Sequence, residues 1–332
     1  DAVTTGSNNT ALGFESAGKL TTGGDNVAVG RAALLDTTTQ SGNVAIGNEA
    51  LENNLADENV AVGKQALNDN TSGNGNTSIG SFSLTKNTTA ANNTAVGYNS
   101  LYTNVTGAGN TAVGKSSLVL NTASNNTAVG FESLCKNSSG TSNTAVGKGS
   151  LKATLTTSEN TGVGAGALNG NTGGCNTGVG SSALENVTGN NNTAVGQRAL
   201  YLNNSGAANT AVGQGALDAN TTGGDHTAVG RNALGANTTS SSNAAFGGNA
   251  LSTNTTGGFN TAVGYDALLS NTTASNNTSV GTNSMRLNTT GTANVAVGHN
   301  SLDANTTGSN NSALGRNALG SNTTGGTNSA FG

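Results

Sequence analysis

Side chains that commonly perform catalysis or bind metals are few and far apart in this sequence. The two histidines, His226 and His299, are well separated along the chain, and the sixteen Asp and Glu residues show no repeated acid–base spacing. No Gly-Lys-Ser/Thr sequence follows a loop suited to phosphate, as nucleotide binding would require. Nucleophile–base pairs and metal sites need several such groups within hydrogen-bonding or coordination distance. We therefore expect no catalytic residue, no metal site and no cofactor, and we do not expect an enzyme.

Aromatic side chains are the remaining candidates for a binding role. Only 3% of the residues are aromatic, but several occupy variable positions that we expect at exposed edges of the fold. Rings in such places can stack on sugars, because they combine a large apolar face with a wet surrounding. They are widely separated in the sequence, and we expect no continuous row of them. The candidate glycan contacts are Tyr98, Tyr102, Phe131, Tyr201 and Tyr265.

A short internal repeat determines where all these side chains lie. The pentapeptide Asn-Thr-Ala-Val-Gly, with small variations, begins at residue 9 and recurs with a period of 17, or 16 in four cases, until residue 328. The full pattern is N-T-A-V-G-x-x-A-L-x-x-N-T-T-G-x-x, and we number its positions 1–17. The chain holds nineteen complete repeats and the start of another, which is typical of a solenoid.

Several positions of the repeat are nearly constant within the chain. Position 5 is Gly in all twenty copies, position 4 is always Val, Ile, Leu or Phe, and position 9 is Leu in seventeen of nineteen copies. Position 3 is Ala, Ser or Gly, position 8 is Ala or Ser, and position 1 is Asn except at His226. Positions 6, 7, 10 and 11 vary and carry the Lys and Arg residues.

This pattern favours an all-β fold, a parallel β-solenoid or β-roll with about 17 residues per coil and 19–20 coils in a single array over residues 1–332. Gly, Asn and Thr disfavour helix, and positions 4 and 9 do not recur at helical spacing. We expect a strand at positions 1–4 and a turn at position 5, where Gly allows a positive φ or a close backbone approach. A second strand should contain positions 8 and 9, and a second turn should follow at positions 12–15.

Alternation along the first strand predicts how the chain associates. Residues at positions 3 and 4 must point to opposite faces, and neither position holds a charged residue. We expect position 4 to fill the interior of the coil and the small residues at position 3 to contact other chains. Burying one Val and one Leu per coil contributes about 3–6 kcal/mol, which is small beside the cost of ordering a coil. The prediction is a homo-oligomer, preferably a trimer, either intertwined or side by side.

Two polar columns allow further predictions. Asn at position 1 can form a ladder, because stacked identical amides hydrogen-bond to the coils above and below; the alternative is that Asn merely suits the turn before the strand. Thr occupies position 2 in thirteen copies, and ice-binding solenoids display arrays of Thr. Those arrays normally have Thr-x-Thr on one strand, whereas position 4 here is apolar. An ice-binding solenoid is therefore only the third hypothesis for the function.

The repeat resembles two families of surface proteins. Asn-Thr-Ala-Val-Gly is similar to the N-S-V-A-I-G motif in head domains of trimeric autotransporter adhesins (YadA-like), which are left-handed parallel β-rolls built as trimers. The longer string at residues 93–107 resembles repeat regions of phage tail-fibre-like proteins. The resemblance covers the whole chain but departs from the adhesin heads in its longer period. It implies a left-handed coil, a trimer and an extracellular location, on a virion tail fibre or at a cell surface.

Composition and the ends of the chain complete the prediction. Charged residues make up 8% of the chain, 12 of them basic and 16 acidic, so we expect no nucleic acid partner. No apolar run is long enough for a membrane helix. Residues 1 and 332 fall at repeat positions 10 and 5, so we expect a segment of a longer fibre with other fibre domains as partners. The leading hypothesis is the structural shaft of an extracellular fibre that holds a binding tip at a distance. The alternative is a module that binds cell-surface glycans directly through its coil edges.

Overall fold

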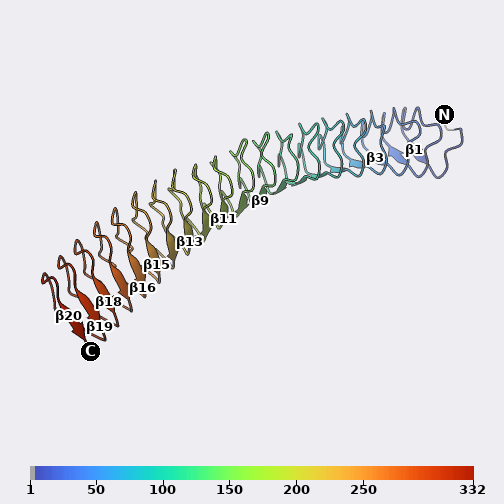
Figure 1. Ribbon diagram of the computed structural model, residues 1–332. Coiled ribbons are helices and arrows are strands. Elements are labelled where there is room, and N and C mark those ends of the chain that lie inside the picture. Colours follow the sequence, from blue (N-terminus) through green and yellow to red (C-terminus); the bar gives the residue numbers. More distant parts are fainter. Residues whose placement is uncertain (1–3) are drawn as a thin grey trace. The chain divides into compact units, whose positions relative to one another are not determined.

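The computed structural model describes residues 4–332 as a parallel β-solenoid, which confirms the predicted fold class. Each repeat makes one turn of the solenoid and contributes one short strand, and this part of the chain contains no helix. The chain divides into two compact units, residues 1–165 and 166–332, which we describe one at a time. Figure 1 shows the strands and their labels.

The first unit contains ten strands, each paired in parallel with the next. The register places identical repeat positions opposite one another, as in the pairing of Thr94 with Thr111 between β6 and β7. The strands are β1 (Thr10–Leu12), β2 (Val27–Val29), β3 (Val44–Ile46), β4 (Val60–Val62), β5 (Thr77–Ile79), β6 (Thr94–Val96), β7 (Thr111–Val113), β8 (Thr127–Val129), β9 (Thr144–Val146) and β10 (Thr161–Val163).

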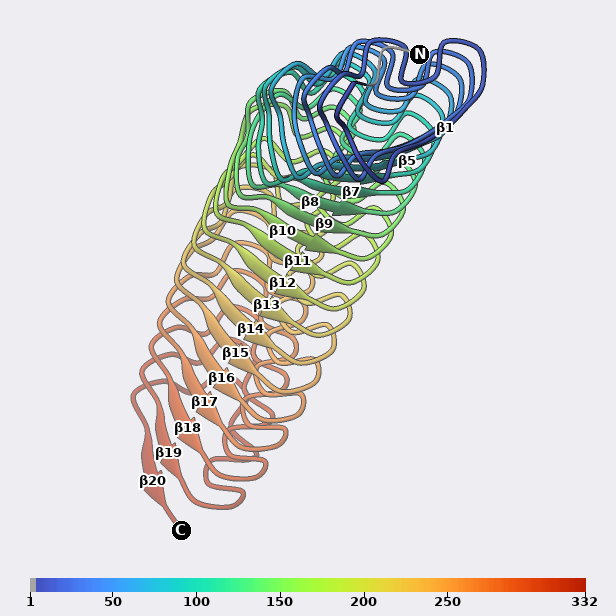
Figure 2. The ribbon, with the colours of Figure 1, turned by 90° about the vertical axis from the view of Figure 1, so that its right-hand side faces the viewer.

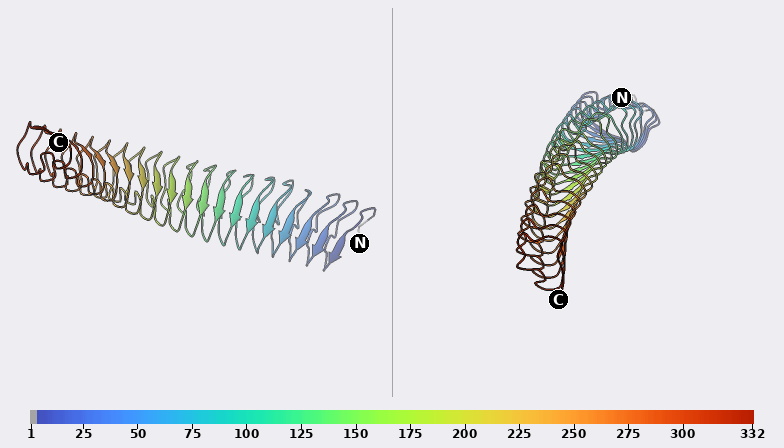
Figure 3. Two further views of the ribbon diagram at one scale, coloured as in Figure 1. Left: turned by 90° about the horizontal axis from the view of Figure 1, so that it is seen from below. Right: turned by 60° about the vertical axis from the view of Figure 1, so that its left-hand side comes forward.

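The second unit repeats this arrangement. Thr210 of β13 is paired with Thr227 of β14, and Figures 2 and 3 show the strands side by side on one wall of the stacked coils. The strands are β11 (Thr177–Val179), β12 (Thr193–Val195), β13 (Thr210–Val212), β14 (Thr227–Val229), β15 (Ala244–Phe246), β16 (Thr261–Val263), β17 (Thr278–Val280), β18 (Val295–Val297), β19 (Ser312–Leu314) and β20 (Ser329–Phe331).

The wall opposite the strands is built from turns, so the prediction of a second strand at positions 8 and 9 is wrong. Positions 7 and 9 adopt left-handed backbone conformations, as in Asn232 (φ 56°) and Leu234 (φ 52°). Left-handed residues at alternate positions fold the chain into successive turns and prevent an extended strand. Backbone hydrogen bonds still join neighbouring coils here, because the Leu234 N–H donates to the Ala250 carbonyl oxygen at 3.0 Å.

Gly at position 5 is required for both of the reasons that we expected, a positive φ and a close approach of the backbone. Its φ angle lies between 112° and 141° in all twenty copies, a region that residues with a Cβ rarely adopt. The backbones of adjacent coils also approach closely there, since a Cβ added to Gly230 would lie 2.3 Å from the carbonyl oxygen of Gly247. Any other residue at this position would meet both a conformational and a steric penalty.

Our assignment of the two strand faces is wrong, because position 3 points into the coil and position 4 points outward. In β16, Ala262 is fully buried whereas 37% of Val263 is exposed. The two walls are close together: a Cβ added to Gly178, at position 3, would lie 3.2 Å from Cγ of Leu168 and 3.1 Å from the Ala183 carbonyl oxygen. Only Ala, Ser or Gly fits in this gap. The small residues at position 3 therefore pack inside their own chain and give no evidence for contact between chains.

Buried Asn side chains connect the coils, which confirms the ladder predicted at position 1. Oδ1 of Asn260 accepts a hydrogen bond from the Asn277 N–H, where the next coil begins (3.0 Å), and its Nδ2 donates to the Ala274 carbonyl oxygen near the end of its own coil (2.8 Å). Each such amide thus satisfies one backbone donor of the following coil and one backbone acceptor of its own. The partner is mainly backbone, whereas we expected contacts between the amides themselves.

A second Asn ladder lies at position 12, where we expected only a turn. Nδ2 of Asn254 donates to Oδ1 of Asn237 (3.0 Å), and Oδ1 of Asn254 accepts from Nδ2 of Asn271 (2.8 Å). These amides have no exposed surface. Most coil interiors therefore hold one Leu, two small residues and two amides, and these amides bond along the stack.

Candidate functional site

The five predicted glycan contacts fall on two edges of the coils. Tyr98, Phe131 and Tyr265, at position 6, expose 48%, 42% and 54% of their surface. Tyr102 and Tyr201, at position 10, are half-buried, and the guanidinium of Arg198 lies 4.4 Å from the Tyr201 ring centroid. Position 6 therefore presents its rings to solvent more openly than position 10 does.

Five side chains on consecutive coils of the first unit form what we call the cation–aromatic row: Lys64, Phe82, Tyr98, Lys115 and Phe131. Nζ of Lys64 lies 5.5 Å from the Phe82 ring centroid, and the Phe82 and Tyr98 rings pack edge to face at 5.9 Å. Nζ of Lys115 lies 5.9 Å from the Tyr98 centroid and 6.0 Å from that of Phe131. The predicted aromatic contacts themselves form no unbroken row, but Lys115 connects Tyr98 with Phe131 two coils away.

The repeat explains why these side chains come together. Lys64, Tyr98, Lys115 and Phe131 occupy position 6, immediately after the turn at Gly, and Phe82 occupies position 7. Stacked strands lie about 4.8 Å apart, so side chains of this length reach the neighbouring coil. The edge is held in register by backbone bonds, such as the 2.9 Å bond from the Ser116 N–H to the Tyr98 carbonyl oxygen. Aligning the sequence by its period could have revealed the row.

The sequence around Lys115 matches the letters of a phosphate-binding loop, although our sequence analysis found no Gly-Lys-Ser/Thr after a loop suited to phosphate. Residues 109–116 read G-x-x-x-x-G-K-S, whose backbone N–H groups would have to point at a phosphate. Here the stretch contains strand β7, and its N–H groups bond to adjacent coils: Thr111 to the Asn126 carbonyl oxygen (2.9 Å) and Gly114 to that of Val96 (2.7 Å). The stretch is an ordinary coil and forms no phosphate cradle.

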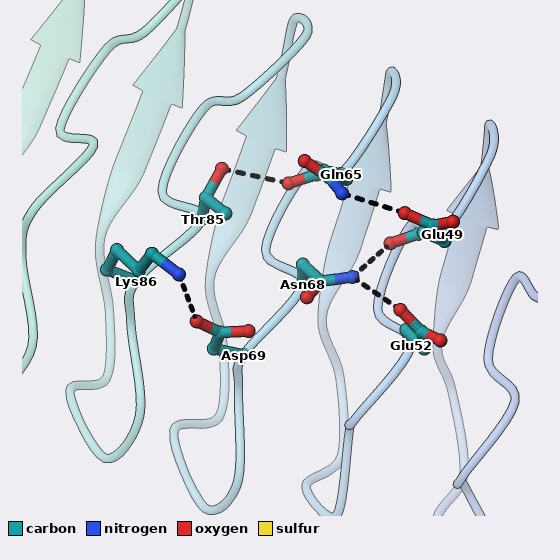
Figure 4. Close-up of polar contacts among 7 residues, drawn as sticks. All are labelled: Glu49, Glu52, Gln65, Asn68, Asp69, Thr85 and Lys86. Carbon is teal, nitrogen blue, oxygen red and sulfur yellow. Dashed lines mark hydrogen bonds and ion pairs between the residues drawn. The ribbon is translucent and has the colours of Figure 1, made fainter.

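Acidic side chains in this unit are engaged with neighbours on adjacent coils, as Figure 4 shows. Gln65 Nε2 donates to Glu49 (2.7 Å), Asn68 Nδ2 donates to Glu52 (3.0 Å), and Lys86 Nζ pairs with Asp69 at 2.9 Å. The hydrogen bond and charge of Asp69 raise the pKa of Lys86. Such exposed contacts contribute little stability, and of these three only the ion pair between Lys86 and Asp69 neutralises charge.

The segment from Lys64 to Lys152 is basic although the whole chain carries a net charge of −4. It contains six lysines and two acidic residues, a balance of +4. Both acids are paired, Asp69 with Lys86 and Glu132 with Lys152, and the hydrogen bond that Lys152 donates to Glu132 raises the pKa of Lys152. Within the described residues no ion pair engages the other four lysines, Lys64, Lys115, Lys136 and Lys148.

The two histidines have separate environments. His299 is exposed. His226 is buried in the position 1 column, where Nε2 lies 2.7 Å from the Ser240 carbonyl oxygen and Nδ1 lies 3.1 Å from the Asn243 backbone nitrogen. Burial lowers the pKa of His226. Among residues 4–332, no group of three or more His, Cys, Asp or Glu side chains is placed to hold a metal ion.

The outer face of the strands, which we define as the side chains at positions 2 and 4, is the largest regular surface feature of each unit. It holds no charged residue, and position 4 is apolar in every coil. Ile79 in the first unit and Phe246 in the second, both at position 4, each expose 41% of their surface. Contiguous apolar surface of this kind commonly marks an interaction site.

No protein-family model matches this sequence, and no curated protein matches it significantly. In the described residues, no helix is long and apolar enough to cross a membrane. Any functional conclusion must therefore come from the geometry of the coils and their surface.

Proposed function

We propose that this chain is a structural shaft segment of an extracellular fibre, in which copies of the chain pack together through the outer face of their strands. The observation that carries the proposal is the unbroken set of bonds between coils. Within each unit every strand is paired in parallel with its neighbour, and buried amides repeat the connection at positions 1 and 12. A stack in which each coil is hydrogen-bonded in register to the next suits a long, stiff and protease-resistant element.

The outer face supports self-association. A Val that is about one third exposed offers on the order of 50 Å² of apolar surface per coil. Position 4 of the ten coils in one unit then offers roughly 500 Å², and position 2 brings the total close to the ~800 Å² per partner of a standard interface. A second copy has the same spacing between coils, so its side chains can interdigitate along the whole face. We expect the oligomer to be a trimer, because the repeat resembles those of trimeric fibre proteins.

Sedimentation tests this association. Replacing Val195, Val212 and Val229 with Lys places three charges on the outer face of consecutive coils, where an interface would have to bury them. A matched control puts the same three charges at exposed position 6: Ser181→Lys, Gln197→Lys and Gln214→Lys. We expect an oligomer for the wild type and the control at ~10 μM and a folded monomer for the outer-face variant, since burying like charges costs several kcal/mol. A wild-type chain that is folded and monomeric at that concentration would contradict the proposal.

The outer face also keeps the ice-binding hypothesis open to test. Thr at position 2 and the apolar residue at position 4 point outward from the same strand, as Thr261 and Val263 do. If this face is covered by another copy, it cannot contact ice. Thermal hysteresis measured on the wild type and on the three-Lys outer-face variant separates the two functions, because an ice-binding face would give hysteresis that the variant abolishes.

Direct attachment to glycans, the alternative function, is favoured at one place on the surface. That place is the cation–aromatic row of the first unit.

A further inference from the structure

We propose that the cation–aromatic row, together with Lys148 on the next coil, binds a linear anionic polysaccharide whose charges are carboxylates. The inference does not depend on the shaft proposal. The row and Lys148 occupy six consecutive coils, so they extend over about 24 Å at ~4.8 Å per coil. They form a line along the stack, and a line fits an extended polymer better than a compact small molecule.

The aromatic members supply surface for stacking. Tyr98 and Phe131 expose 48% and 42% of their surface, and they lie two coils apart, or about 10 Å. Apolar ring faces pack against the C–H face of a sugar, and the phenol hydroxyl of Tyr can hydrogen-bond to its hydroxyl groups. Lys115 lies close to both rings, so each stacking position has a cation beside it.

The lysines supply charge that the protein itself does not neutralise. Lys64, Lys115 and Lys148 are exposed at position 6, and none has an ion pair among the described residues. The acid nearest to Lys115 in sequence, Glu132 beside Phe131, is engaged with Lys152 at 2.6 Å. A carboxylate on a bound polymer would therefore meet a cation without first displacing an internal partner.

The spacing of the charges favours a polysaccharide over a nucleic acid. Lys64 and Lys115 are three coils apart and Lys115 and Lys148 are two coils apart, which gives one cation per ~10–14 Å. A single nucleic acid strand carries a phosphate every few ångströms, and its affinity depends on neutralising many of them. A polysaccharide with a carboxylate on some of its sugars matches the sparse cations. Many weak contacts along one polymer add up, because each contact raises the effective concentration for the next.

Affinity electrophoresis and calorimetry test the proposal with hyaluronan as the probe, because it is a linear polysaccharide with a carboxylate on every second sugar. The row variant combines Lys115→Gln, Lys148→Gln and Tyr98→Ser. The matched control makes the same kinds of change at position 6 of the second unit: Arg231→Gln, Arg316→Gln and Tyr265→Ser. Because all six residues are exposed, both variants should keep the wild-type circular dichroism and melting temperature. We expect the row variant to lose at least tenfold in affinity, the control to match the wild type, and added salt to weaken binding.

Two further probes complete the test. A neutral polysaccharide, dextran, should bind at least tenfold more weakly than hyaluronan, and single-stranded oligo-dT should bind more weakly as well. The proposal is overturned if the wild type does not bind hyaluronan, if the row variant and the control bind equally, if dextran binds as tightly, or if oligo-dT is the tighter ligand.

Discussion

At the scale of single residues, His226 shows how strictly the coil interior selects hydrogen-bonding geometry. Its Nδ1 accepts from the Asn243 N–H (3.1 Å), as Oδ1 of Asn does elsewhere in the column, and its Nε2 is 2.7 Å from the Ser240 carbonyl oxygen, where Asn places Nδ2. This arrangement requires the neutral ring with the proton on Nε2. The replacement of Asn by His is therefore tolerated because one tautomer of imidazole mimics an amide.

His226 should make folding stability depend on pH. Burial lowers the pKa of His226 in the folded chain below its ordinary value, so as the pH falls below about 6.5 the unfolded chain binds the proton first. Stability from this residue is thus present above that pH and lost below it. We expect His226→Asn to reduce the loss of stability between pH 7 and pH 5, measured by urea unfolding.

The exposed His299 provides the control for this prediction. His299→Asn should leave the slope of stability against pH as it is in the wild type. An unchanged slope in His226→Asn would show that the ring is not held neutral by the column.

At the scale of the coil elements, the wall of turns opposite the strands, which we call the turn wall, explains which residues occur at position 9. We misinterpreted this pattern in the sequence. Position 9 contains Leu, Met285 or Ala17 and never Val or Ile, although position 4 is rich in both. Position 9 has a left-handed backbone, with φ of 50° at Leu268 and 48° at Met285. β-Branched residues are strongly disfavoured in that conformation. The absence of Val and Ile was therefore a signal against a second strand.

In the turn wall, we expect the shape of the side chain at position 9 to affect stability even when its volume is unchanged. Leu268→Ile keeps the volume of a fully buried side chain but places a branched Cβ on a left-handed residue. We expect it to lower the free energy of unfolding by more than about 2 kcal/mol. Leu268→Met, which reproduces the residue found at position 9 of the next coil, should cost less than about 1.5 kcal/mol. Urea unfolding would measure both, and equal losses would contradict a conformational origin.

The periodic features could be predicted from the sequence, whereas the direction of the side chains could not. The regular period and the constant Gly at position 5 determine one coil per repeat. Which face of the strand is internal depends on the distance between the strands and the wall of turns opposite them. The turns at positions 7 and 9 set that distance, and they produce no periodic pattern of apolar residues in the sequence. We expected Val at position 4 to fill the interior because it is the larger residue. In fact the gap beside Gly178 and its equivalents accepts only small side chains.

The candidate site, like the fold, could be predicted only in part from the sequence. Tyr98 and Phe131 were predicted as exposed edge residues because their position is variable, and they are exposed. Their connection through Lys115 was missed because the two rings are distant in sequence, although alignment by the repeat puts them only two coils apart. Polar contacts between coils at the edges, such as Lys86 with Asp69, follow from the same alignment.

At the scale of the whole molecule, cohesion comes from contacts between neighbouring coils. In the second unit the position 12 amides form a continuous chain of hydrogen bonds from Asn203 to Asn322, with donor–acceptor distances of 2.7–3.1 Å. Each link joins equivalent positions of adjacent coils, so a coil is interchangeable with the next as far as its interior is concerned. Stability should therefore depend on keeping the register and only weakly on the number of coils.

Deleting one complete coil tests this dependence on register. Removing residues 260–276 joins Phe259 to Asn277, so Asn, Ser, Met and Asn at positions 1, 3, 9 and 12 of the following coil move into the equivalent columns, and the lost hydrogen bonds between coils form again. We expect a melting temperature within a few degrees of the wild type. Removing only residues 260–267 deletes β16 but leaves the rest of its coil, which is too short to close a turn and leaves the Asn and Leu columns interrupted. That variant should lose more than about 4 kcal/mol of unfolding free energy, measured by urea unfolding followed by circular dichroism. If the longer deletion destabilises the protein as much as the shorter one, the coils do not behave as equivalent units, and the shaft proposal loses its structural basis.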